Sequence, residues 1–428
     1  MQPIRGADSS DDLAGREPMT AKPSKGSILV LAYYYPPQNT SGAARPSRFV
    51  KYLGEIGFRM HVISAGVGAD TVLVDGEAID SDAVWLKMAS SAGRVYNRLV
   101  GAYGDRMPWV PYATNAAVNV LSRQPLDFII STSPPLATHL VAMRLKQKFR
   151  IPWIADFRDP LAGNPFGPKR QNYRSFLERK IFEFADLVLS TTDVLQKAWA
   201  ERYPQYNHKF HTIWNGFDPE EGVEAVPSRG EGPRILAHVG EIYGARTPRM
   251  IIDSLDRLFH SGRIGLNDIR LCLVGPLDEN SSLRSNAAFL RLRETGLVEC
   301  REGLVDRSQA LAITAQADQL LLLDVSDVDV SLQLPAKLFD YLRVQRPVVA
   351  QTTKGSPSDR ILANSGVPHE CIYRDDTAAM VDDKLLRALQ LPRATNPANE
   401  WFWSQFDGRR QAHQLAALLG GFHRGSSA

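Results

Sequence analysis

The sequence predicts an α/β protein built from two doubly wound parallel-sheet domains that face each other across a cleft. Three observations predict this fold class. The chain of 428 residues is too long for one hydrophobic core. Short apolar runs alternate with longer segments of helical spacing, which is typical of βαβ units and parallel sheets. A stretch rich in Gly, Pro and acidic residues, Asn215 to Arg234, interrupts this alternation and has the composition of a linker.

The first half of the chain contains six strand candidates with helices fitting between them. The earliest is the apolar run SILVLA, which indicates a buried strand and is followed by a loop with two prolines and a glycine. The others are short runs rich in aliphatic and β-branched residues. The predicted strands are 27–34, 59–64, 126–132, 151–156, 186–191 and 211–214, and the predicted helices are 45–56, 108–123, 135–148, 169–184 and 193–201.

The same alternation restarts after the linker. The predicted strands of the second half are 234–240, 269–275, 297–302, 319–325 and 347–351, again with helices between them. The polar first residues, mixed in charge, are expected to form a disordered tail. We therefore divide the chain into a tail at 1–26, a first domain at 27–215, a linker at 216–233, a second domain at 234–395 and a final helix at 396–420, which is a candidate to cross back to the first domain.

The composition is that of an ordinary globular protein and argues against several classes. A net charge of +3 is small for this length and does not by itself favour nucleic acid. No apolar run approaches the ~18 residues needed to span a bilayer, and the first residues lack the apolar segment of a secretory signal. The three cysteines are far apart, which indicates a reduced, cytosolic chain with no disulfide frame and no zinc spacing; they are Cys272, Cys300 and Cys371.

Ligands of parallel sheets bind at the carboxyl ends of the strands, so chemistry is expected in the loops there. The first such loop, Tyr33 to Arg45, reads YYYPPQNTSGAAR. Gly42 lies immediately before a helical segment, whose free N–H groups and partial charge of about half a unit favour an anion. The alternative is a plain strand-to-helix turn, because the other glycines of a dinucleotide fingerprint are missing.

A counterpart in the second half is HVGEIYGAR, His238 to Arg246. Gly240 ends a strand and Gly244 permits a sharp turn, while the following Thr-Pro signals a helix start. Arg246 is placed to meet a phosphate with its fork of donors. The alternative is a surface arginine at a helix start.

A third loop, Asp329 to Ala350, places Pro335 at a helix start, followed by Lys337 and Asp340 about one turn apart. A lysine at this position can meet a phosphate, and an aspartate can accept from sugar hydroxyls. The alternative is an ordinary exposed ion pair, which contributes well under ~1 kcal/mol.

Six segments, taken in their order and spacing, resemble glycosyltransferase family 4, in particular its bacterial polysaccharide and lipopolysaccharide branch. They fall within residues 27 to 420 and read YYYPPQNTSGAARPSRFVKYLGEIGFRMHVIS, STSPPLATHL, IPWIADFRDP, WNGFDPE, HVGEIYGARTP and LPAKLFDYLRVQRPVVA. The resemblance implies the GT-B fold, two Rossmann-like domains with an acceptor-side first domain and a donor-side second domain. It implies a retaining transferase that moves a sugar from a nucleotide-sugar donor to a glycan or lipid-linked glycan in cell-surface polysaccharide biosynthesis. It also implies a cytoplasmic protein, with the inner face of the cell membrane as a candidate place of peripheral association.

The resemblance also assigns the donor contacts. Backbone groups near Gly42 would approach the diphosphate from the first domain, and Arg246 would hold it from the second. The turn REGLV, Arg301 to Val305, would meet the base, and Asp340 would bind the ribose. The implied donor-binding residues are Gly42, Ala43, Gly240, Glu241, Arg246, Gly303, Leu304, Lys337 and Asp340.

Catalytic residues are implied in the loop ADFRDPLAGNP of the first domain. Asp156 or Asp159 would orient an acceptor hydroxyl, and Arg158 would offset phosphate charge. The alternative is a buried Asp–Arg pair that shapes the loop. Relatives are described as using same-face attack, in which the leaving phosphate oxygen helps to remove the acceptor proton, so no catalytic triad is expected.

The sequence departs from the family at two places. The first of two family glutamates falls on Leu332, which cannot hydrogen-bond through its side chain, so Gln333 or Lys337 would have to substitute. Many relatives have a histidine in the ADFRDP loop, and this chain does not. Both departures keep a second class open, a GT-B-fold subunit that binds nucleotide sugar or glycan without turnover.

Four weaker signals have other readings. The D-x-D within DVSDVDVS, Asp324 to Ser331, resembles a metal site of another transferase fold, but lies too late in the second domain; no metal or cofactor is expected. The stretch 168–186 is amphipathic and basic, so it either docks on an anionic membrane or packs on its own domain. The segment RMPWVPYA, 106–113, is a candidate for an acceptor groove. His139 and His238 lie in or beside apolar segments, where local hydrogen bonds satisfy most histidines.

Overall fold

The structure is a computed structural model that describes residues 25–38, 40–66, 72–79, 106–164, 171–223, 226, 230–244, 246–279, 281–324 and 331–425. The predicted tail at 1–26 lies outside these residues apart from Lys25 and Gly26. The core of the D-x-D segment, residues 325–330, also lies outside them.

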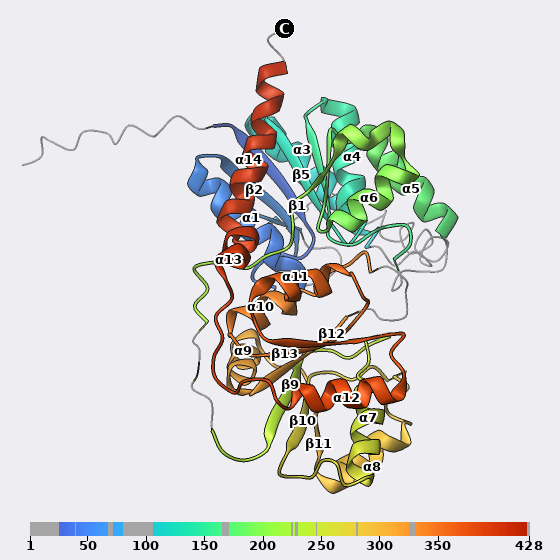
Figure 1. Ribbon diagram of the computed structural model, residues 1–428. Helices are drawn as coiled ribbons and strands as arrows, with labels where there is room; N and C mark the ends of the chain where they lie inside the picture. Colours follow the sequence, from blue (N-terminus) through green and yellow to red (C-terminus); the bar gives the residue numbers. More distant parts are fainter. Residues whose placement is uncertain are drawn as a thin grey trace, which may run out of the picture.

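An eight-stranded sheet forms the centre of the N-terminal half (Figure 1). Its strands are β1 (Ser27–Ala32), β2 (Arg59–Ala65), β3 (Val72–Val74), β4 (Glu77–Ile79), β5 (Phe128–Ser133), β6 (Trp153–Phe157), β7 (Leu187–Ser190) and β8 (Phe210–Thr212). Their order is β4-β3-β2-β1-β5-β6-β7-β8. The six predicted strands pair in parallel. The sequence analysis missed β3 and β4, an antiparallel edge of three residues per strand, too short to give a periodic pattern.

Helices cover both faces of this sheet, which explains why β1 is apolar without interruption. Leu29 and Leu31 pack into the core on one face, whereas Ile28 and Val30 pack into the core on the other. Successive side chains of a strand point to opposite faces, so both sets had to be apolar. The helices of this half are α1 (Ser41–Ile56), α3 (Trp109–Arg123), α4 (Ala137–Phe149), α5 (Gln171–Phe184) and α6 (Asp193–Arg202), followed by the 3₁₀ helix η2 (Pro204–Lys209).

A six-stranded, all-parallel sheet forms the C-terminal half. Its strands are β9 (Arg234–Val239), β10 (Ile269–Val274), β11 (Val298–Arg301), β12 (Gln319–Leu323), β13 (Val348–Thr352) and β14 (His369–Tyr373). Their order, β11-β10-β9-β12-β13-β14, is that of the dinucleotide-binding fold. The sequence analysis missed β14, whose residues HECIY mix polar and apolar side chains. The predicted fold class, two doubly wound parallel sheets, is confirmed.

The helices of the C-terminal half also lie on both faces of their sheet. One core includes side chains of α7 (Arg249–His260), α8 (Ala287–Thr295) and α12 (Ala378–Ala388). The other includes side chains of α10 (Lys337–Arg343), α11 (Pro357–Ser365) and α13 (Glu400–Phe406), beside α9 (Arg307–Gln316).

The chain passes between the two halves twice, and the two passages lie side by side. Phe217 N–H donates to the carbonyl of Phe406 at 3.1 Å, and Gly408 N–H donates to the carbonyl of Phe217 at 3.0 Å. After the second passage, α14 (Gly408–Gly425) packs on α1 and buries Leu415 and Leu419 in the N-terminal core (Figure 1). The last helix of the chain therefore completes the first domain.

Candidate functional site

Each sheet has one strand where the order of connections reverses, and both predicted phosphate loops follow such a strand. β1 lies between β2 and β5, and β9 lies between β10 and β12. In doubly wound sheets the ligand binds beyond the carboxyl end of the strands at this switch point. The loop 33–40 that leads into α1 and the loop 240–248 that leads into α7 both occupy these positions.

Gly42 lies in the first turn of α1, which begins four residues earlier than predicted, at Ser41. Pro46 follows inside the helix and has no N–H for the carbonyl of Gly42, four residues before it. The guanidinium of Arg158 takes up that carbonyl instead, donating to it from Nη1. A Cβ added at Gly42 would lie 2.8 Å from the same Nη1, so the absence of a side chain allows this approach.

Arg158 serves as a brace rather than an open cation. Its Nη2 donates to the carbonyl of Pro134, and its Nε donates to that of Ser133 at 3.2 Å. With Gly42, these contacts join the loops that follow β1, β5 and β6. Burial lowers the pKa of Arg158, an effect that Asp159 and Asp156 oppose.

Asp156 is fully buried near the end of β6, and its partner is Arg45. Arg45 Nη2 donates to Oδ1 at 2.8 Å and Thr132 Oγ1 donates to Oδ2 at 2.9 Å. Arg45 also donates to the carbonyls of Ile213 and Trp214 at 2.9 and 2.8 Å, where the chain leaves the first domain. The sequence analysis considered an Asp–Arg pair here but did not identify Arg45, which lies 111 residues away. The arrangement makes Asp156 a positioning group for α1 and the crossing.

Asp159 is the carboxylate of this loop that faces the second domain. Burial raises its pKa, while the positive charges of Arg158 and then Arg246 oppose that rise. The backbone just beyond it is held by the buried Glu178, whose Oε2 accepts from the N–H groups of Leu161 at 3.2 Å and Ala162 at 2.9 Å. Asp159 and Arg246 are thus brought together from opposite sides of the cleft.

Lys337 lies at the start of α10, with its side chain across Gly240. A Cβ at Gly240 would lie 2.2 Å from Lys337 Nζ, and the φ of +126° at Gly240 is itself rare for other residues. Lys337 Nζ donates to Nε2 of the buried His238 at 3.3 Å. Burial and then the charge of Arg246 lower the pKa of Lys337 to about 8, while the charges of Glu241 and Asp340 oppose this change.

Arg246 is held over the ring of Tyr243, with its guanidinium carbon 5.5 Å from the ring centroid. Its Nη1 donates to the Tyr243 hydroxyl at 2.6 Å. The predicted donor residue Glu241 is exposed, and its charge raises the pKa of Lys337. Arg246, Lys337 and Glu241 therefore gather at the carboxyl end of β9.

Asp340 takes part in an ionic cluster that the sequence analysis did not anticipate. Arg307 donates to its two carboxylate oxygens at 3.0 and 3.1 Å and also pairs with Glu221 of the linker at 2.6 Å. Arg343 pairs with Glu221 at 3.1 Å. Arg307 follows the REGLV turn by two residues, so neither a strand end nor a glycine marks its position in the sequence.

Gly303 and Leu304, the predicted base contacts, lie in the turn between β11 and α9. Gly303 has a φ of +133°, and the side chain of Leu304 is 91% exposed. Neither side chain can form a hydrogen bond, so any polar contact from these two residues would come from their backbone groups.

Leu332 and Gln333 contact the first domain. The Leu332 side chain packs against the N-terminal core, and its carbonyl accepts from Thr192 Oγ1 at 2.9 Å. Gln333 Nε2 donates to Asn164 Oδ1 at 3.4 Å, while its buried Oε1 makes no hydrogen bond. Leu332, which stands in place of the family glutamate, thus forms a contact between the domains. The side-chain oxygen of Gln333 is still able to accept a hydrogen bond.

No group of three or more His, Cys, Asp or Glu side chains suited to a metal ion occurs in the part of the chain that the structure describes. Asp324, the first residue of the D-x-D stretch, is buried and accepts from Thr352 Oγ1 at 3.0 Å and Ser358 Oγ at 2.6 Å. Among the described helices, none is long and apolar enough to cross a membrane.

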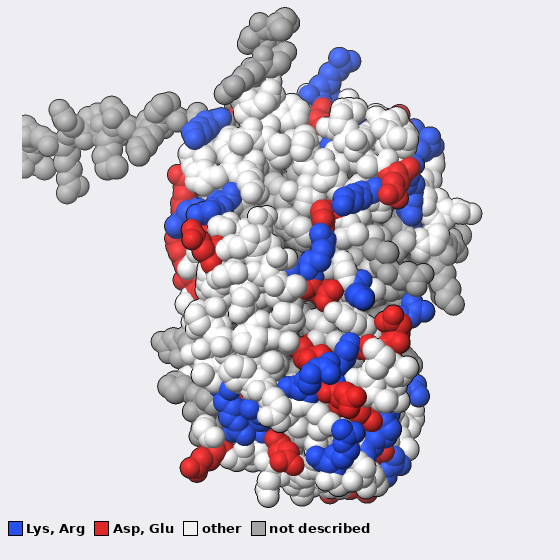
Figure 2. Space-filling view, viewed as in Figure 1, with Lys and Arg blue, Asp and Glu red and all other residues white. Residues whose placement is uncertain are grey.

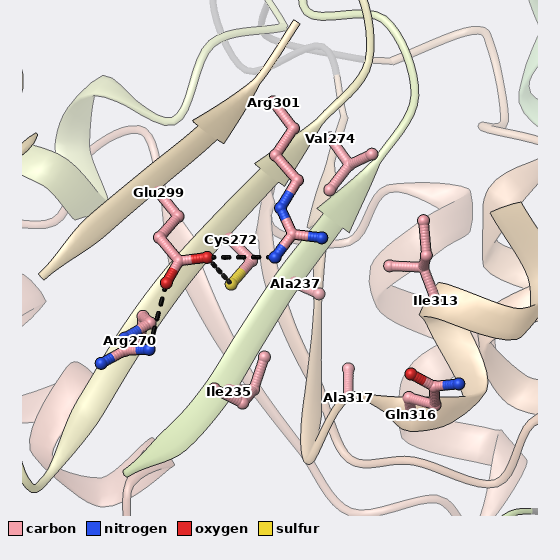
Figure 3. A pocket seen from close by; sticks show the side chains of 10 residues that line it. All are labelled: Ile235, Ala237, Arg270, Cys272, Val274, Glu299, Arg301, Ile313, Gln316 and Ala317. Carbon is pink, nitrogen blue, oxygen red and sulfur yellow. Dashed lines mark hydrogen bonds and ion pairs between the residues drawn. The ribbon is translucent and has the colours of Figure 1, made fainter. Parts of the chain in front are cut away.

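The surface charges and a pocket in the second domain do not single out these loops. Figure 2 shows positive and negative side chains interspersed on one face of the molecule rather than gathered in a field of one sign. A pocket between β9, β10, β11 and the end of α9 contains a charged row in which Glu299 joins Arg270 at 3.0 Å and Arg301 at 3.3 Å (Figure 3). None of the predicted site residues lines it.

Comparison with known proteins agrees with this layout. Residues 43–216 match the model of the glycosyl transferase 4-like domain. Sucrose-phosphate synthase from Thermosynechococcus elongatus superimposes with a TM-score of 0.63 at 15% identity, covering 94% of this chain and 100% of that one. HepE of Anabaena, in complex with UDP and glucose, gives 0.57 at 14% identity, covering 92% and 100%. The apo lipopolysaccharide outer core galactosyltransferase WaaB gives 0.56 at 11% identity, covering 91% and 98%.

At these identities the solved structures establish the fold, and no curated protein matches the chain. The family model supplies the class for the N-terminal half. The chain therefore has the fold of the GT-B glycosyltransferases, and its residues 43–216 are similar to the glycosyl transferase 4-like domain.

Proposed function

We propose that the protein is a retaining glycosyltransferase that moves a sugar from a nucleotide-sugar donor to a glycan or lipid-linked glycan in cell-surface polysaccharide biosynthesis. The GT-B fold supports a donor in the cleft between the halves. The resemblance to HepE, solved with UDP and glucose, supports a uridine diphosphate sugar as the first donor to test. WaaB, a lipopolysaccharide galactosyltransferase, supports the choice of pathway.

The observation that carries the proposal is the pair of cations at the switch point of the C-terminal sheet. Burial is the main cause that lowers the pKa of Lys337, and the nearby charge of Arg246 adds to that effect. Two neighbouring cations repel each other unless an anion lies between them, and perturbed groups of this kind concentrate at functional sites. A bound diphosphate would add negative charge to that of Asp159, Glu241 and Asp340, the carboxylates that act on this pair.

In the proposed reaction, the bond from the sugar's anomeric carbon to the phosphate oxygen breaks, and a bond to the acceptor oxygen forms on the same face. The acceptor proton passes to the leaving phosphate oxygen. Arg246 and Lys337 stabilise the charge that develops on the diphosphate, which is the largest contribution a protein makes in such a step. The backbone N–H of Gly42, in the first turn of α1, would add a donor from the other side of the cleft. The N–H of Ala43, which was also predicted to meet the donor, instead donates to the carbonyl of Thr40 at 2.9 Å.

The remaining predicted residues take supporting roles. Asp159 faces the cations and is our candidate to orient the acceptor hydroxyl, whereas Asp156 and Arg158 hold the loops in place. Asp340 meets the ribose together with Arg307, and Gly303 and Leu304 offer backbone to the base.

The test is a screen for nucleoside diphosphate release from UDP-, GDP- and ADP-sugars, with and without a chelator. Wild-type protein is expected to release nucleotide from at least one donor, and Arg246→Ala is expected to abolish it. Arg249→Ala is a matched control, since Arg249 is an exposed arginine three residues later, in the first turn of α7. Inhibition by the chelator would contradict the metal-independent mechanism.

A second candidate is a binding subunit without turnover. It is favoured by Leu332, whose side chain is engaged by the first domain rather than by the cleft. Calorimetric binding of a nucleotide sugar without release of nucleotide from any donor would support this candidate and contradict the enzyme.

Peripheral attachment to the inner membrane face is also proposed. Phe149 and Phe176 are exposed, on the contacting helices α4 and α5, and a basic side chain lies over each ring. Lys148 Nζ is 5.1 Å from the centroid of Phe149, and the guanidinium carbon of Arg179 is 5.9 Å from that of Phe176. Aromatic and basic groups together favour anionic lipid. Co-sedimentation with phosphatidylglycerol vesicles that is lost in Phe176→Ser would support attachment, and no sedimentation would contradict it.

A further inference from the structure

The hydrogen-bond contacts of His238 favour one tautomer of its ring. The residue is buried near the end of β9, and its Nδ1 lies 2.9 Å from the carbonyl oxygen of Leu321 in β12. A carbonyl only accepts, so Nδ1 carries the hydrogen. The other ring nitrogen, Nε2, therefore presents a lone pair, and Lys337 Nζ lies 3.3 Å from it. The histidine receives a hydrogen bond from the lysine.

The lysine is constrained on its other sides as well. Its side chain crosses Gly240, where any Cβ would stand 2.4 Å from the Lys337 Cε. The charged groups that act on it are Arg246 and Glu241, from the loop after β9, and Asp340, on its own helix. His238 is the group beneath the amino nitrogen that can accept from it.

We propose that His238 is a positioning residue that holds the ammonium of Lys337 at the donor diphosphate. The identity of that ligand rests on the proposed function, but the constraint on Lys337 does not. A histidine that merely filled the core would need no partner at Nε2. His139 is such a case, because its Nδ1 bonds to Ser131 Oγ at 2.7 Å while its buried Nε2 has no hydrogen-bond partner.

Protonation states agree with this geometry. Burial and then the charge of Lys337 lower the pKa of His238 to about 3, although backbone groups of Leu321 and Glu241 oppose this, so the ring is neutral at neutral pH. Burial lowers the pKa of Lys337 to about 8, so the ammonium is present at neutral pH and is lost as the pH rises through that value. An acceptor at Nε2 favours the charged form of the lysine.

The test measures binding of inorganic pyrophosphate by calorimetry across neutral and mildly alkaline pH, which requires no knowledge of the base. His238→Leu is expected to weaken binding at neutral pH by about tenfold to a hundredfold, the usual worth of a hydrogen bond to a charged group. It is also expected to shift the alkaline loss of binding to lower pH. His238→Gln retains both a donor and an acceptor and is expected to bind within a few-fold of wild type.

Two controls separate this role from a structural one. His369→Leu removes a histidine of the same sheet whose Nδ1 also lies 2.9 Å from a backbone carbonyl, and it should leave pyrophosphate binding unchanged. In a Lys337→Ala background, adding His238→Leu should cause no further loss, because the histidine acts through the lysine. Denaturant unfolding of each variant checks that the compared proteins are folded.

Three results would overturn the inference. The first is that His238→Leu binds pyrophosphate with the affinity and pH profile of wild type. The second is that His238→Leu weakens binding equally in the presence of Lys337 and in the Lys337→Ala background. The third is that wild type does not bind pyrophosphate. Failure of the proposed function has a different signature, since wild type would then bind pyrophosphate through His238 and Lys337 but release nucleotide from no sugar donor.

Discussion

The two halves of the cleft use their cations differently. In the N-terminal half, Arg45 pairs with the buried carboxylate of Asp156, and Arg158 donates to three backbone carbonyls. In the C-terminal half, Arg246 donates to the Tyr243 hydroxyl and Lys337 to the His238 ring. These two hydrogen-bond partners are neutral, and the carboxylates of Asp159, Glu241 and Asp340 act on the two cations through their charge. The comparison indicates that the first half uses its cations to hold loops, and it supports our proposal that the second half uses them to hold an anion.

The largest expected effect is on stability, in the first half. Asp156→Ala leaves the guanidinium of Arg45 buried without its carboxylate, which is expected to lower the free energy of unfolding by about 3–5 kcal/mol. Urea denaturation measures it. A decrease in the free energy of unfolding smaller than the value of about 1 kcal/mol for an exposed ion pair would contradict a structural role for Asp156.

The next effect is on activity, in the second half. Arg246→Ala is expected to lower kcat/KM for the donor by about a hundredfold to a thousandfold, as for loss of one donor to a developing oxyanion. Arg246→Lys keeps the charge but loses the fork and is expected to recover part of the rate. A large loss of stability with the same loss of rate would make Arg246 a brace like Arg158.

Gly42→Ala tests both sides of the comparison at once. The new Cβ would lie 2.8 Å from Arg158 Nη1 and 2.9 Å from the ring of Tyr34. Overpacking of this kind costs about 1–3 kcal/mol of stability. Displacement of Arg158 is expected to lower turnover by about a hundredfold, as misplacements near 1 Å do. If the loss of turnover is no larger than the loss of folded protein explains, the loop is a plain strand-to-helix turn with no role at the donor.

The smallest effect is expected at an exposed ion pair between the halves. Arg360 Nη2 lies 2.6 Å from Asp193 Oδ1, with both side chains partly in water. Asp193→Ala is expected to change the free energy of unfolding by under about 1 kcal/mol. Urea denaturation at low and high salt measures it, and a change of several kcal/mol would show that exposed contacts fix the domains as strongly as buried ones.

The fold was predictable because its signals are local, and the missed parts lacked them. The buried run SILVLA and its counterparts indicate parallel strands. In contrast, β3 is too short and β14 is too polar to give such a pattern. Gly42 was predicted as a site residue from its place before a helix. The requirement for a glycine there depends on Pro46 and on Arg158, which lies 116 residues away. No spacing in the sequence links Arg45 to Asp156 or Arg307 to Asp340, since each pair forms only when separate elements meet.

The central claim is that a donor diphosphate lies between Arg246 and Lys337. A crystal structure with a bound, non-transferable nucleotide sugar tests it most directly. We expect diphosphate oxygens within hydrogen-bond distance of the Arg246 guanidinium and of Lys337 Nζ, with Lys337 still bonded to His238. A diphosphate bound elsewhere, with Arg246 and Lys337 facing only protein groups, would contradict it.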